Sequence, residues 1–275
     1  MSEIFGFDAY APREIAQRVE TVGVAKARLA LLPLALLGVL AGAFIGLGAL
    51  GFVIVKSDPG LGYAAGQWLG GLVFSLGLLL VVVAGAELFT GNNLLAMAWA
   101  DGKISARELL RNWIVVCLAN LMGAAGLALL VFLSGHPQLN GGAIAQTVFK
   151  IALAKQNLPW QEALFRGVLC NLLVCMAVWM AMAGRSVVDK AVAIVFPVSA
   201  FVAAGFEHSI ANMYLMPLAW LLQQSGAVPP APLITGAGML GNWLPVIAGN
   251  LLGGSVLVAL TYHLIYRRNP AHPEA

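Results

Sequence analysis

The sequence predicts an all-α polytopic membrane protein whose six transmembrane helices form two inverted three-helix repeats, with helices 2 and 5 broken. Three observations carry this prediction. The chain of 275 residues is 60% hydrophobic and 10% charged, with a mean hydropathy of +0.88, whereas soluble domains are about 25% charged. Six apolar stretches are long enough to cross a membrane, and two matching polar patches interrupt apolar runs.

The apolar stretches follow one another along nearly the whole chain. Each is about as long as the roughly 20 residues that an α-helix needs to cross a hydrocarbon core of about 30 Å. They run over residues 29–55, 66–100, 108–134, 164–184, 191–222 and 243–266. We therefore expect residues 1–275 to form a single membrane domain in a lipid bilayer.

The segment before the first span is polar. Residues 1–28 are rich in charges and lack an apolar core followed by a small-residue cleavage site, so we expect no cleaved signal peptide. Ile15, Val19 and Val22 share one face at helical spacing, which predicts a short amphipathic helix at the membrane surface. A disordered tail is the alternative interpretation.

Lysines and arginines are unevenly divided between the two sides that six spans define. Eleven fall on the side of the termini, and only Lys56, Lys150, Lys155 and Arg166 fall on the other. The positive-inside rule then predicts that residues 1–28 and the tail 269–275 lie in the cytoplasm, with the protein in the inner (cytoplasmic) membrane. We interpret the net charge of +3 as this topology signal and expect no nucleic-acid partner.

Two polar patches, residues 85–95 and 205–215, match each other inside apolar runs. Gly85, Glu87, Asn92 and Leu95 correspond to Gly205, Glu207, Asn212 and Leu215, each pair 120 residues apart. Polar groups at membrane depth are expensive and indicate a functional site. Interrupted apolar segments at corresponding positions of two halves point to the substrate site of a transporter.

Weaker matches extend the repeat beyond these patches. Lys26 and Gly38 recur 129 residues later as Lys155 and Gly167, and Asn112, Asn120 and Gly123 recur 130 residues later as Asn242, Asn250 and Gly253. Their near-constant offset makes chance a poor explanation. Because three spans are an odd number, the second repeat (155–268) must insert upside down relative to the first (29–134). Such an arrangement places a substrate path at the interface between the repeats.

The patches Glu87-Leu-Phe-Thr-Gly91 and Gly205-Phe-Glu-His-Ser-Ile-Ala-Asn-Met213 closely resemble the signatures of the formate/nitrite transporter family. The resemblance implies an aquaporin-like fold in a homopentamer, each protomer with its own path for small monovalent weak-acid anions. We therefore expect transport of formate, either as an anion channel or coupled to protons. Nitrite, hydrosulfide, acetate and lactate also fit the range of this family.

One histidine carries the expected chemistry. An isolated histidine on an apolar segment is usually a packing residue, but His208 lies in a helix break and falls on the family's central histidine. A bare carboxylate in a dry constriction faces several kcal/mol of desolvation, and a proton or an imidazolium partner removes most of that barrier. The resemblance implies that Thr90 and Asn171 hydrogen-bond around this histidine; alone, they would be a helix cap and an interhelical contact.

The resemblance also implies hydrophobic constrictions on both sides of His208. We expect Phe74 and Phe201 to narrow the outer side and Phe89 the inner side, and Leu78 and Val174 match further constriction positions. Periodicity alone would leave all of these as ordinary core or lipid-facing residues.

The repeat also pairs charges near the two ends of the path. Lys26 and Lys155 stand before the two halves, and Glu87 and Glu207 lie in the two patches. Symmetry predicts that Lys26 lies near Glu87 and Lys155 near Glu207, one pair at each mouth. Such lysines would attract anions into both vestibules, although a surface lysine is ordinarily only solvated.

Other classes of function lack their sequence signals. The histidines are scattered without a base–nucleophile pair or a ligand cluster, and no glycine-rich phosphate loop occurs, so we expect no enzyme activity, cofactor or metal. Asn269-Pro270-Ala271 spells the best-known aquaporin tripeptide, but it lies beyond the sixth span and has no second copy. An aquaglyceroporin-like channel for neutral solutes is the closest alternative.

Overall fold

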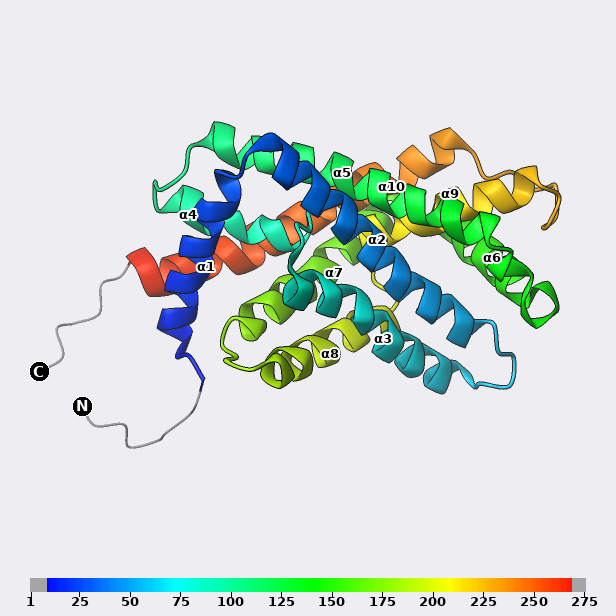
Figure 1. Ribbon diagram of the computed structural model, residues 1–275, viewed down its shortest axis with the longest axis horizontal. Coiled ribbons are helices and arrows are strands. Elements are labelled where there is room, and N and C mark those ends of the chain that lie inside the picture. Colours follow the sequence, from blue (N-terminus) through cyan, green and yellow to red (C-terminus); the bar gives the residue numbers. More distant parts are fainter. Residues whose placement is uncertain (1–8, 269–275) are drawn as a thin grey trace, which may run out of the picture.

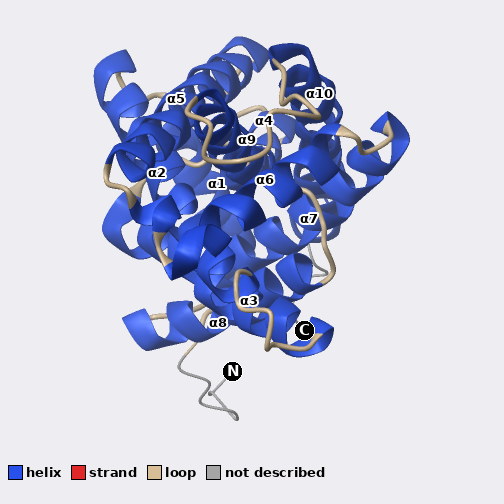
Figure 2. Cartoon of the chain, turned by 90° about the vertical axis from the view of Figure 1, so that its right-hand side faces the viewer, coloured by secondary structure: helices blue, strands red, loops and turns tan. Residues whose placement is uncertain are grey.

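The computed structural model describes residues 9–268, which form helices joined by loops (Figure 1) and contain no strand in that range (Figure 2). The α-helices are α1 (Pro12–Ala27), α2 (Leu31–Lys56), α3 (Tyr63–Leu79), α4 (Ala96–Ala100), α5 (Ala106–Leu133), α6 (Ala143–Gln156), α7 (Trp160–Ala181), α8 (Val187–Ala203), α9 (Ser209–Gln224), α10 (Gly236–Leu251) and α11 (Thr261–His263). The first eight residues, the tail 269–275 and its Asn-Pro-Ala tripeptide lie outside the described residues.

Shorter helical turns extend these elements. π-helical turns continue α3 over Leu80–Gly85 and α10 over Leu252–Leu260, and a third, Leu264–Arg268, follows α11. 3-10 turns occupy Gly91–Leu95, directly before α4, and His136–Gln138 and Asn140–Gly142, directly before α6. The chain therefore stays helical through most of each predicted span.

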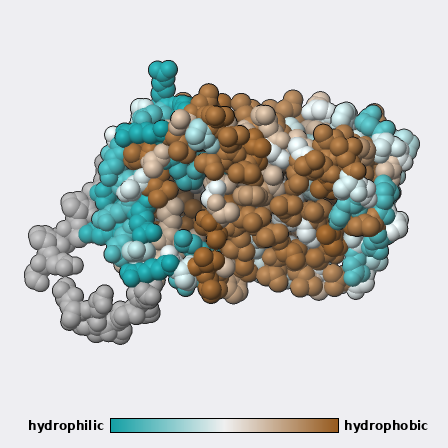
Figure 3. Space-filling model, viewed as in Figure 1, coloured by the Kyte–Doolittle hydropathy of each residue, from teal (hydrophilic) through white to brown (hydrophobic). Residues whose placement is uncertain are grey.

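Five continuous helices within residues 9–268 are long and apolar enough to cross a membrane. They are Leu31–Lys56, Tyr63–Gly85, Ala106–Leu133, Trp160–Ala181 and Gly236–Arg267. The predicted fifth span, 191–222, is divided between α8 and α9, which have 17 and 16 residues. Figure 3 shows a broad apolar region across the middle of the molecule and hydrophilic residues toward both ends, as expected for a protein embedded in a bilayer.

Two short non-helical segments lie within predicted spans 2 and 5. Helical backbone ends at Gly85 and resumes at Gly91, and it ends again at Ala203 and resumes at Ser209. Gly85 and Gly205 have φ values of 85° and 71°, a left-handed conformation that glycine adopts without a steric penalty. The same residue type therefore turns the chain out of the helix at both equivalent positions.

The long helices pack in two equivalent sets. α2 lies against α3 and α5, α7 lies against α8 and α10, and α3 contacts α8 between the sets. A Cβ atom on Gly123 would collide with the carbonyl of Val39, and one on Gly253 would collide with the carbonyl of Val168. Glycine at these two points lets the helix backbones touch, as small residues do in membrane bundles.

α1 lies at the end of the molecule where the last described helical turn also lies (Figure 1). There Arg267 Nε approaches Glu20 Oε2 at 2.9 Å. Ile15 and Val19 are buried in a cluster with Trp179, so this part of the face packs on protein. Val22, predicted on the same face, is 37% exposed and borders a cavity. The predicted helix is therefore present, and its position at the membrane surface stays a prediction.

α6 fills the connection that the sequence left between the two repeats. Its buried residues Ile144, Val148 and Ala152 recur at helical spacing. With 14 residues it is too short to cross a bilayer, so its length does not mark it as a membrane span. It nevertheless carries Lys155 in its last turn.

Candidate functional site

The first non-helical segment is held by a polar network around Glu87. Lys26 Nζ lies 2.9 Å from Glu87 Oε1, and Asn92 Nδ2 donates to Glu87 Oε2 at 2.7 Å. Asn92 Nδ2 also lies 3.0 Å from Asn112 Oδ1. Glu87 is only 5% exposed, so these donors replace the water that its carboxylate loses on burial.

The second segment repeats this network around Glu207. Lys155 Nζ lies 2.7 Å from Glu207 Oε1, Asn212 Nδ2 donates to Glu207 Oε2 at 2.6 Å, and Asn212 Nδ2 lies 2.8 Å from Asn242 Oδ1. The structure thus contains both lysine–glutamate pairs that the repeat predicted, with asparagine partners at repeat-matched positions.

Two further asparagines tie the loops to the neighbouring helices. Asn120 Nδ2 donates to the carbonyls of Gly38 at 2.7 Å and Glu87 at 2.9 Å, and Asn120 Oδ1 accepts from the amide of Phe89 at 2.9 Å. The Asn120 side chain therefore hydrogen-bonds to loop backbone groups that lack a helical partner.

Asn250 does the same in the second half. Its Nδ2 donates to the carbonyls of Gly167 at 2.9 Å and Glu207 at 3.0 Å, and its Oδ1 accepts from the amide of Ser209 at 3.0 Å. The sequence marked Asn120 and Asn250 only as repeat matches and gave them no role. The repeat match pointed to both asparagines, but only the folded structure identifies the loop backbone groups that they contact.

His208 occupies a loop position at which the two repeats carry different residues. It is 3% exposed, and its Nε2 lies 3.0 Å from Thr90 Oγ1 in the other loop. His208 Nδ1 accepts a hydrogen bond from the amide of Ala211 at 3.2 Å, which caps the N-terminus of α9. Because Nδ1 acts as the acceptor, the neutral ring carries its proton on Nε2 and donates to Thr90 Oγ1.

Asn171 supports Thr90 rather than the histidine. Its Nδ2 lies 3.2 Å from the Thr90 carbonyl, 2.8 Å from Asn93 Oδ1 and 2.7 Å from the Asn250 carbonyl. Among residues 9–268 no hydrogen bond joins Asn171 to His208, so the role of Asn171 around the ring stays a prediction.

Aromatic rings lie on one side of His208. The ring of Phe201 stacks on the imidazole with centroids 6.0 Å apart and an angle of 18°. Phe74 meets Phe201 edge to face, with centroids 5.8 Å apart and an angle of 83°. Leu78, Phe89 and Val174, the other predicted constriction residues, are buried to the same degree, each 2% exposed.

Two cavities lie near the two loops. The larger, about 500 Å³, is bordered by Lys26, Leu78, Glu87, Arg18 and Lys190 among others. Neither Arg18 nor Lys190 was assigned to the site from the sequence, because they lie far apart in the chain and neither has a repeat match. Within the described residues, no group of three or more His, Cys, Asp or Glu side chains could hold a metal ion.

The smaller cavity, about 130 Å³, is bordered by Phe74, Phe201, Lys155, Glu207 and His208. The predicted histidine, the Phe74–Phe201 pair and one lysine–glutamate pair therefore border the same cavity. His208 does not border the larger cavity, so in this structure the imidazole faces the Lys155 side of the molecule.

The chain matches known proteins over almost its full length. The model of the formate/nitrite transporter family matches residues 13–264. The formate channel FocA of Escherichia coli K12 is 39% identical over 278 residues, covering 97% of this chain and 98% of FocA. FocB, a formate channel of the same strain, is 36% identical over 265 residues, covering 92% of this chain and 93% of FocB.

Solved structures agree with these matches. An ion channel of the FNT family has a TM-score of 0.82 at 33% identity, covering 92% of this chain and 98% of that one. A pentameric formate channel with formate bound has a TM-score of 0.79 at 37% identity, covering 86% and 98%. These relatives are channels rather than enzymes, and the chain belongs to the formate/nitrite transporter family.

Proposed function

We propose that this protein carries small monovalent weak-acid anions across the membrane, with formate as the principal substrate, and that His208 assists by sharing or supplying a proton. The hydrogen bond of 3.0 Å between Thr90 Oγ1 and His208 Nε2 is the observation that carries the proposal. It joins the two loops beside an aromatic constriction and a cavity. The formate channels among the relatives support the choice of substrate.

The hydrogen-bond directions define two ways in which the imidazole acts. As a neutral donor, His208 Nε2–H occupies a lone pair of Thr90 Oγ1 and leaves the hydroxyl proton of Thr90 for an anion oxygen. To supply a proton outright, His208 must first become an imidazolium. Protonation of Nδ1 then displaces the hydrogen bond from the Ala211 amide. The two modes differ in how flux depends on pH.

The proposed architecture has six spans in two inverted repeats, 29–134 and 155–268, with an aquaporin-like fold. In it, α3 and α4 form one broken span, and α8 and α9 form another. The twofold recurrence of the lysine–glutamate–asparagine network supports this arrangement. The asparagine contacts to both loops explain how irregular backbone would be tolerated at membrane depth.

We further propose a homopentamer in the inner membrane, with both termini in the cytoplasm. The pentameric solved relative supports the oligomer, and the excess of lysine and arginine on one side supports the orientation. Native mass spectrometry in mild detergent tests the assembly, and a stable monomer or tetramer would refute it.

Lys26 and Lys155 are proposed to draw anions toward the two ends of the path. Their ion pairs with buried glutamates offset part of their charge, with side-chain exposures of 25% for Lys26 and 16% for Lys155. The remaining attraction is therefore local, and it acts where an anion begins to lose its hydration shell.

Uptake into proteoliposomes tests the substrate. Formate, nitrite, hydrosulfide, acetate, lactate and glycerol should be compared at two pH values. Fast uptake of formate with no uptake of glycerol is the expected result. Fast uptake of glycerol without any anion would instead indicate a neutral-solute channel.

A further inference from the structure

Tyr214 places a hydroxyl in the apolar core of the protein. It lies on α9, is 0% exposed, and its hydroxyl oxygen has no hydrogen-bond partner among the described residues. Buried hydroxyls are nearly always bonded, and an unmet one destabilises the fold. A phenylalanine would fill the same space without this loss, so packing alone does not explain a tyrosine here.

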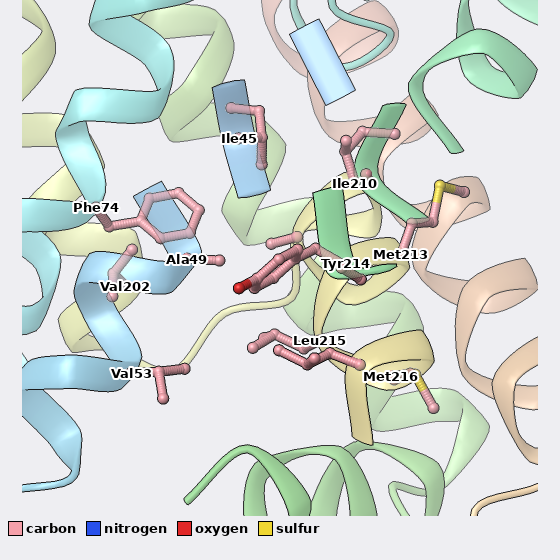
Figure 4. Packing of buried hydrophobic residues seen from close by; sticks show 14 of the residues in the cluster. Ile45, Ala49, Val53, Phe74, Val202, Ile210, Met213, Tyr214, Leu215 and Met216 are labelled. Atoms are coloured by element: carbon pink, nitrogen blue, oxygen red, sulfur yellow. The ribbon is translucent and has the colours of Figure 1, made fainter. Parts of the chain in front are cut away.

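The ring of Tyr214 reaches across α2 toward the outer constriction. A Cβ atom on Gly46 would lie 3.0 Å from Tyr214 Cδ2, so the glycine leaves room for the ring to pass. Figure 4 shows the hydroxyl directed toward Ala49, Phe74 and Val202 rather than back toward its own helix. Phe74 is the residue that meets Phe201 edge to face at 5.8 Å.

Three apolar residues of the buried cluster that contains Tyr214 also border the smaller cavity. Phe74, Val202 and Leu215 belong to the same buried cluster as Tyr214, and all three also border the cavity that contains His208. Tyr214 itself does not border the cavity. A displacement of Phe74, which an anion passing the Phe74–Phe201 constriction requires, would uncover the hydroxyl to the path.

We propose that Tyr214 contacts the substrate at the outer constriction, where its hydroxyl hydrogen-bonds to the passing anion or its accompanying water when Phe74 moves aside. This inference rests on the proposed function. In the closed arrangement the hydroxyl is unpaired, and in the open one it gains a partner. The hydroxyl therefore shifts the equilibrium toward the open, wetted constriction. It also provides a polar contact where an anion has shed water but has not reached His208.

Tyr214→Phe tests this, because it removes the oxygen and keeps the ring. We expect formate uptake into proteoliposomes to fall several-fold while the melting temperature in detergent stays equal or rises. A merely structural role would lower both together. Ser199→Ala is the matched control, since Ser199 Oγ is also buried without a partner but borders neither cavity. It should leave uptake unchanged.

The outcomes separate this inference from the proposed function. If the wild type takes up formate and Tyr214→Phe does so at the same rate, the role of Tyr214 is overturned and the proposed function stays intact. A lower melting temperature in Tyr214→Phe also overturns it, since the hydroxyl would then have a stabilising partner. If the wild type moves no anion, the proposed function fails. In that case the osmotic water permeability of the wild type is compared with that of Tyr214→Phe. Equal permeabilities contradict the inference about Tyr214.

Discussion

Thr90 and His208 come from opposite halves of the chain, yet Thr90 Oγ1 lies 3.0 Å from His208 Nε2. Neither residue has a repeat counterpart: Ile210 stands 120 residues after Thr90, and Leu88 stands 120 residues before His208. The surrounding network recurs in both halves, whereas this contact occurs once among residues 9–268. The repeat therefore accounts for the networks that hold the two loops. His208, the titratable group between the loops, has no equivalent in the first repeat.

Thr90→Val tests the hydroxyl in this pair. Valine keeps the shape of the side chain but leaves His208 Nε2–H without its acceptor, so we expect formate uptake to fall about tenfold or more, equivalent to ~1.4 kcal/mol. Thr90→Ser restores an oxygen and should retain most of the uptake. Equal rates in Thr90→Val and wild type, measured in proteoliposomes, would show that the hydroxyl has no part in transport.

Lys155→Ala tests the capture of anions. We expect the apparent affinity for formate to weaken about tenfold at low ionic strength, more than folding is harmed, and the difference to shrink in high salt, where charges are screened. Lys150→Ala is the matched control, because Lys150 is exposed on the same helix.

Folding must be separated from capture in this experiment, because Lys155→Ala leaves the buried carboxylate of Glu207 without its cation. Adding Glu207→Gln should recover melting temperature without recovering affinity. An unchanged apparent affinity of Lys155→Ala at low salt would count against the role of this lysine.

Asn250→Asp tests how the second loop is held. An aspartate can still accept from the Ser209 amide but cannot donate to the carbonyls of Gly167 and Glu207. Each carbonyl left unpaired costs ~1–3 kcal/mol, so we expect a clear fall in melting temperature. Asn157→Asp, at an exposed position at the end of α6, should change it little. Similar melting temperatures for both variants would contradict this account of the loop.

The matched patches indicated much of this organisation before the structure. The patches predicted interruptions near Gly85 and Gly205, and the wider repeat predicted both lysine–glutamate pairs, because matched residues imply similar environments. The role of Asn171 was harder to foresee. An asparagine on an apolar helix has many possible partners, and its contact with the Thr90 carbonyl depends on how α7 packs against the first loop.

Other features left no usable pattern in the chain. α6 is amphipathic and short, so neither length nor hydropathy marks it as a membrane element. Arg18 and Lys190 border one cavity from α1 and α8, but they share neither a motif nor a repeat position. Tyr214 looks like any aromatic residue in an apolar run, and only the missing partner of its hydroxyl distinguishes it.

Formate uptake by two variants of His208 across a pH series tests most directly whether this histidine shares or supplies a proton to the anion. His208→Phe should reduce uptake roughly a hundredfold or more while the oligomer stays intact by native mass spectrometry. His208→Asn keeps a polar side chain, so it should pass some formate but lose the wild-type pH dependence. Wild-type rates and an unchanged pH profile in both variants would make His208 a packing residue and contradict the mechanism.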